Sequence, residues 1–128
     1  DGRLLSGKVR QAQAVITLLT GETDAHVYNL VELPKGALID PSQSFVQAEN
    51  PAGTLVADIG VPSDPNALTA SPLTLSSGGK VFFNTSVDEV PLYEVADGDE
   101  LVSLTANTLT TPSNGAQVRV CITYVDRY

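Results

Sequence analysis

The chain has 128 residues, a formal net charge of −8 and a sequence pI of about 4.3. This length fits one ordinary domain with a proper core, and a hydrophobic fraction of 42% excludes a disordered chain. The acidity argues against nucleic acid as a partner, since phosphate binding needs clustered Lys and Arg. A membrane is excluded as well, because no stretch approaches the roughly 18–20 apolar residues of a span.

The first residues differ in character from the rest. Residues 1–13 are polar and show no clear period, so we predict an extended N-terminal arm there and a β-sandwich domain over residues 14–128. No secretory signal is recognisable at the start. Because Asp1 is not an initiator methionine, a start of the native chain further upstream stays open.

The basic residues gather at this end. Arg3, Lys8 and Arg10 are three of the seven Lys and Arg residues. We expect them to bind an acidic partner, with Val9 as an apolar anchor. Solubility alone is the alternative interpretation of the same residues.

Short segments of β type, separated by turn residues, follow in chain order. The turn at Pro34-Lys35-Gly36 is typical: Pro fixes its own φ, and Gly accepts a positive φ. No window shows convincing helical amphipathicity, and the spacing predicts an all-β, single-domain antiparallel β-sandwich or a barrel. The predicted strands are residues 14–20, 25–33, 37–40, 44–48, 54–60, 80–85, 91–96, 100–109 and 117 to the C-terminal end. Pro72 interrupts residues 68–75, which we expect to be an edge strand or an irregular segment.

The last segment has the clearest alternation. Val118, Val120, Ile122 and Tyr124 share one face, which we predict to be the core face, since a period of two is that of a strand with one buried side. The same period puts residues 55, 57 and 59 on one face, and residues 102, 104, 106 and 108 on one face.

Few residues could carry chemistry. The single Cys121 excludes an intrachain disulfide and every multi-cysteine zinc site. His26 has no recognisable nucleophile partner, and we interpret it as a surface or interface residue. Asp97, Asp99 and Glu100 form an acidic turn without the pattern of a calcium loop. We therefore predict no catalytic residue, no metal site and no cofactor.

Taken in order, the segments resemble small head decoration (cement) proteins and related capsid-associated β proteins of tailed bacteriophages. The residues that carry the resemblance are YNLVELPKGALI at 28–39, TLVADIG at 54–60 and GAQVRVCITY at 115–124. The resemblance implies a jelly-roll or related sandwich without enzymatic activity, which sits on the outer surface of the virion capsid. It also implies the major capsid protein as partner and self-association, often as a homotrimer.

Two other classes stay open from the residues. A carbohydrate- or receptor-binding module of a head or tail fibre is the runner-up, although aromatic residues are only 5% of the chain. A small hydrolase is the third hypothesis.

Overall fold

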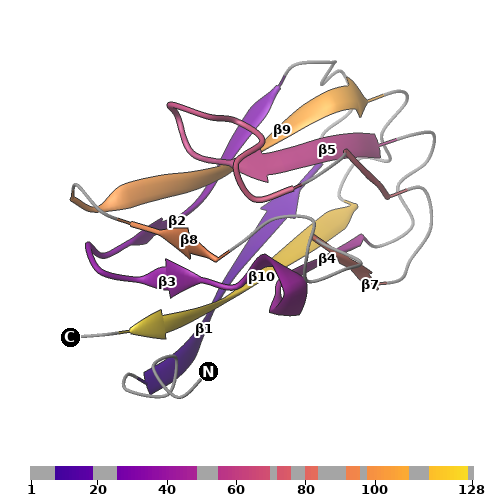
Figure 1. Ribbon diagram of the computed structural model, residues 1–128. Helices are drawn as coiled ribbons and strands as arrows, with labels where there is room; N and C mark the ends of the chain where they lie inside the picture. Colours follow the sequence, from indigo (N-terminus) through magenta and orange to yellow (C-terminus); the bar gives the residue numbers. More distant parts are fainter. Residues whose placement is uncertain are drawn as a thin grey trace.

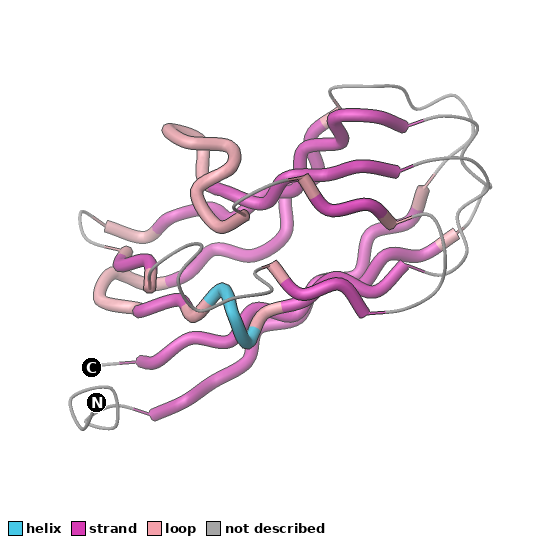
Figure 2. The backbone as a smooth tube through the Cα atoms, turned by 45° about the vertical axis from the view of Figure 1, so that its right-hand side comes forward, coloured by secondary structure: helices cyan, strands magenta, loops and turns pink. Residues whose placement is uncertain are grey.

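The protein folds as two antiparallel β-sheets packed face to face (Figure 1). The computed structural model describes residues 8–18, 26–48, 55–69, 72–75, 80–83, 92–95, 98–109 and 116–126. Figure 2 shows the two layers edge-on, with the core between them. The all-β sandwich predicted from the sequence is confirmed.

The first sheet is built around β10 (Gln117–Asp126), which lies at its centre. β1 (Lys8–Thr17) pairs with β10 along its whole length. On the other side of β10, β3 (Leu38–Ile39) and β4 (Phe45–Ala48) pair in tandem, separated by a short 3-10 helix (Pro41–Gln43). The outer row consists of β8 (Tyr93–Glu94) beside β3 and β7 (Lys80–Phe82) beside β4.

The second sheet has the order β2-β9-β5-β6. If the interrupted pairs β3/β4 and β7/β8 are each counted as one strand, each sheet has four strands. Successive strands alternate between the sheets, except that β5 and β6 are neighbours in the second sheet. That is the connectivity of a jelly roll. The strands of this sheet are β2 (Val27–Leu33), β9 (Glu100–Leu109), β5 (Leu55–Gly60) and β6 (Leu73–Thr74).

The core face of β10 is the predicted one. Val118, Val120 and Ile122 are buried, while Tyr124 is half-buried and packs against the edge of the core. Cys121, on the opposite face, is buried as well, because Gln13 of β1 and Phe45 of β4 flank it in register.

A bulge in the second sheet changes which residues face inward. The register of β5 on β9 passes from Val56–Thr108 to Ala57–Ala106, so Asn107 is an extra residue in β9. Such a bulge reverses the alternation beyond it, and Leu109 is buried while Thr108 is not. The prediction that residue 108 shares the core face of 102, 104 and 106 is therefore wrong.

The N-terminal boundary also differs from the prediction. The first strand begins at Lys8 and not at residue 14, and Lys8 to Gln13 pair with Asp126 to Cys121. Ala12 and Ile16 pack against the core, and their polar neighbours hid the strand in the sequence. Residues 1–7, the remainder of the expected arm, lie outside the described residues.

Candidate functional site

The outer face of the first sheet carries side chains that the core does not use. Along β1 and β10, these are the residues that alternate with the buried ones, and the in-register residues of β3, β4 and β7 extend the same surface. We call this surface the outer face. Its members are Val9, Gln11, Gln13, Val15, Leu38, Phe45, Gln47, Lys80, Phe82, Gln117, Arg119, Cys121, Thr123 and Val125.

One end of the outer face is aromatic and cationic. Phe45 and Phe82 lie side by side on β4 and β7, with ring centroids 5.6 Å apart. The Lys80 ammonium sits 4.5 Å from the centroid of the Phe45 ring, within cation–π range. Arg119 is exposed in the next row. In a chain of net charge −8, this is a local cationic surface with an apolar base.

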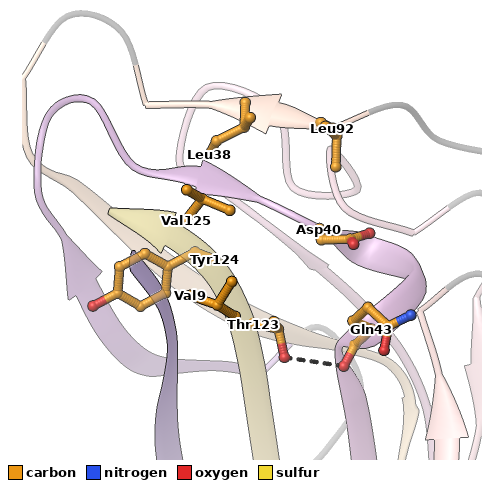
Figure 3. A pocket seen from close by; sticks show the side chains of 8 residues that line it. All are labelled: Val9, Leu38, Asp40, Gln43, Leu92, Thr123, Tyr124 and Val125. Atoms are coloured by element: carbon orange, nitrogen blue, oxygen red, sulfur yellow. Dashed lines mark hydrogen bonds between the residues drawn. The ribbon is translucent and has the colours of Figure 1, made fainter. Parts of the chain in front are cut away.

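The other end holds a half-open pocket of about 310 Å³ (Figure 3). The start of β1, the C-terminal end of β10, β3, the 3-10 helix and the residue before β8 meet there. Val9 and Leu92 are exposed, by 65% and 37%, so apolar side chains at the mouth reach solvent. The lining residues are Val9, Leu38, Asp40, Gln43, Leu92, Thr123, Tyr124 and Val125.

Hydrogen bonds hold the polar side of the pocket in place. The Asp40 carboxylate accepts from the Ser42 backbone N–H at 3.1 Å and from the Ser42 hydroxyl at 2.7 Å, which caps the 3-10 helix. The Thr123 hydroxyl donates to the Gln43 carbonyl at 3.1 Å, and the Thr123 N–H donates to the Ser44 hydroxyl at 3.0 Å. The helix is thus fastened to β10, and the pocket is preformed.

Arg10, near the start of β1, forms an ion pair. Its Nε contacts Oδ2 of Asp126 at 3.1 Å, across the β1–β10 pair. The Arg10 side chain is 49% exposed, so water screens this ion pair, and its stabilising effect is small. A partner could compete for either charge at little cost to folding.

The structure places the contact residues predicted from the sequence in different positions. Val9 lines the pocket, and Arg10 pairs with Asp126. Lys8 is the first residue of β1, and nothing is described of its side chain; Arg3 lies outside the described residues. Leu38 and Leu92 were not predicted, because only the pairing of β3 with β8 and β10 brings these distant segments together. A signal existed for Val125, which shares the face of Cys121 in the alternation of β10.

The residues considered as catalytic or metal-binding candidates make contacts that serve the structure. The His26 ring lies 4.5 Å from that of Tyr28, centroid to centroid. Asp99 accepts a hydrogen bond from the Lys35 N–H at 3.1 Å and so ties two loops together, while Asp97 lies outside the described residues. Among the residues that the structure describes, no three His, Cys, Asp or Glu side chains are grouped as metal ligands would be.

Cys121 has a perturbed thiol. Burial raises its pKa, and the charges of Arg119 and Lys80 oppose this effect in part. A thiol with a raised pKa carries less of the reactive thiolate at neutral pH.

Solved structures of other proteins contain chains with a similar fold. No family model matches the sequence, and no curated protein matches it. Among solved structures, a chain in the capsid of Ralstonia phage GP4 is similar with a TM-score of 0.70 and 20% identity, over 94% of this chain and 85% of that one. The fold is that of chains found in phage capsids.

Two further capsid structures contain similar chains. One belongs to the capsid asymmetric unit of cyanophage Pam1, with a TM-score of 0.63 and 19% identity over 93% of this chain and 85% of that one. The other belongs to the acid-stable capsid of Helicobacter pylori bacteriophage KHP30, with a TM-score of 0.56 and 19% identity over 94% and 89%. At such identities the likeness concerns the fold. Within the described part of this chain, no helix is long and apolar enough to cross a membrane.

Proposed function

We propose that this protein is a virion structural protein of a tailed bacteriophage that binds the outer surface of the capsid and stabilises the head shell. The observation that carries the proposal is the fold. Chains from capsids of three phages match it over at least 93% of this chain and at least 85% of each of theirs. Nearly the whole length of each chain is therefore compared, and no unrelated domain accounts for the match.

The outer face is the surface that we propose turns toward the major capsid protein. It combines an apolar pocket with exposed cations in an acidic molecule, so it fits an acidic partner that offers one apolar side chain. Arg3, Lys8, Val9 and Arg10 belong to the proposed contact. Val9 supplies apolar area at the mouth. Arg10 projects from the other side of the edge strand β1, where it can exchange Asp126 for a carboxylate of a partner that reaches around this edge.

Stabilisation of the shell needs no strong single contact. A protein that touches two neighbouring capsid subunits links them, and many copies on a symmetric lattice multiply a modest contact. We propose that the copies group as homotrimers. Phe82, on the edge strand β7, leaves apolar surface exposed that a neighbouring copy could cover. The proposal includes no catalytic step and no cofactor.

Adding purified protein back to particles that lack it tests both the function and the surface. Leu92→Asp places a charge at the mouth of the pocket, whereas Val27→Asp places the same charge at an exposed apolar residue of the second sheet. We expect the first variant to lose most of its occupancy on the particles and the second to bind like the wild type.

The readout is the amount of bound protein after sedimentation of the particles, together with the temperature at which they release DNA. Failure of the wild type to bind or to raise this temperature would contradict the function. Equal occupancy of the two variants would contradict only the docking surface. Selective binding of the wild type to a glycan array instead of to particles would favour the fibre module.

A further inference from the structure

β1 is a ten-residue edge strand whose outer side is unpaired among the described strands. It pairs with β10 without a register shift, and no other described strand pairs with it. Figure 2 shows it as the outermost strand of the lower layer. Its ten residues contain no proline and no bulge. Natural proteins usually break or cover such an edge, because its free N–H and C=O groups can pair with another strand.

The register identifies which backbone groups are free. The Leu18 N–H donates to the Ala116 carbonyl at 2.8 Å, in continuation of the β1–β10 ladder. Hydrogen-bonded pairs alternate along an antiparallel ladder, so the even-numbered residues of β1 bond to β10. The N–H and C=O groups of Val9, Gln11, Gln13 and Val15 therefore point to the open edge.

The sequence along this edge is close to a palindrome. Residues 9–15 read VRQAQAV, which is symmetric about Ala12 except at its second and sixth positions. If a second copy of β1 paired antiparallel about Ala12, Val9 would lie opposite Val15, and Gln11 opposite Gln13. The four residues whose backbone groups are free would then form the hydrogen-bonded pairs.

We propose that two copies of this chain join through their β1 edges, antiparallel and centred on Ala12, into one continuous sheet. Facing side chains suit each other in this register: the exposed valines meet valines, and glutamine amides can donate to and accept from one another. Arg10 lies opposite Ala14 of the second copy, so no cation faces a cation. A shift of two residues either way would place Val9 opposite Gln13 or Thr17.

The proposed dimer has twofold symmetry, so its contact differs from the one that would join the homotrimers proposed above. Its axis is perpendicular to the sheet, and both outer faces therefore point the same way. If the outer face binds the capsid, as proposed, one dimer presents two docking surfaces to one lattice and gains avidity. The dimer itself does not depend on that function.

A cysteine at the symmetry centre tests the register. Ala12 would be a non-hydrogen-bonded pair with its own copy, in which Cα atoms are about 4.5 Å apart, and a disulfide accepts such a distance. We expect Ala12→Cys to give a covalent dimer on a non-reducing gel under mild oxidation. Ala14→Cys, which would face Arg10, is the matched control and should not exceed the wild type.

Equal crosslinking of the two variants, or none by Ala12→Cys in folded protein, would overturn the proposed register. A second variant tests the edge itself. Gln13→Pro removes an N–H that faces the open edge and leaves the β10 ladder intact, as proline at an edge position can. Gln13→Ala keeps the N–H and serves as its control.

Sedimentation velocity over a range of concentrations reads out the second test. We expect a reversible dimer for the wild type and for Gln13→Ala, and its loss for Gln13→Pro at an unchanged melting temperature. A wild type that shows no dimer at any concentration would overturn the proposal, and so would a dimer that survives in Gln13→Pro. If Gln13→Pro fails to fold, the comparison of Ala12→Cys with Ala14→Cys tests the proposed dimer.

Discussion

At the scale of single residues, neighbours in β10 meet different surroundings. Ile122 is 1% exposed and lies in the core, whereas Thr123 lies on the outer face and bonds to the 3-10 helix. The strand alternation seen in the sequence was sufficient to assign both positions. It could not assign the burial of Cys121, which depends on flanking residues from β1 and β4.

Truncation at Ile122 should be costly. We expect Ile122→Ala to lower the free energy of unfolding by about 2–4 kcal/mol, from lost burial and the cavity left behind. Thr123→Ala removes one exposed hydrogen bond to the Gln43 carbonyl and should cost about 1 kcal/mol. Urea denaturation of both variants measures the difference. Equal losses would mean that the core face of β10 is misassigned.

The Cys121 thiol should be inert in the folded protein. Its pKa is raised by burial, so little thiolate exists near neutral pH. We expect slow reaction with a thiol reagent under native conditions and fast reaction in denaturant.

The raised pKa of the Cys121 thiol also predicts how the stability of the fold depends on pH. As pH rises through the ordinary pKa of the thiol, the unfolded chain releases its proton before the folded one, so stability should fall. Cys121→Ala should lack this component of the pH profile. Native-state labelling as fast as that of the denatured chain would contradict the assigned burial.

At the scale of elements, local pattern and turn chemistry predicted most strands. The turn at Pro34-Lys35-Gly36 forms as expected, with Gly36 at φ 94° and a hydrogen bond from the Ala37 N–H to the Pro34 carbonyl at 3.1 Å. The bulge at Asn107 was not predictable, because an inserted residue leaves no mark on composition. The start of β1 was missed because an edge strand exposes one side, so its polar residues hid the period.

Truncations from the N-terminus should separate β1 from the residues before it. Compared with a chain lacking residues 1–7, a chain lacking residues 1–13 also loses the pairing of Lys8 to Gln13 with β10. We expect the longer deletion to melt several degrees lower, since about 1 kcal/mol corresponds to roughly 4 °C in a domain of this size. Equal melting temperatures in a calorimetric scan would mean that these residues do not contribute to the sheet.

At the scale of the whole molecule, the pocket could not be predicted from the sequence. It forms where both ends of the chain meet segments near residues 38–43 and residue 92, and only the jelly-roll topology joins these parts. Of the contact residues expected from the sequence, Val9 lines the pocket and Arg10 pairs with Asp126, and their role in binding stays a prediction. The proposed contact with the capsid thus rests on tertiary structure more than on a motif.

A cryo-electron microscopy map of the parent virion would test the proposed role on the capsid. We expect density for this sandwich on the outside of the head shell, in groups of three, with the outer face of the first sheet against the major capsid protein. Density for the chain confined to a tail or fibre, or its absence from the particle, would rule out this role.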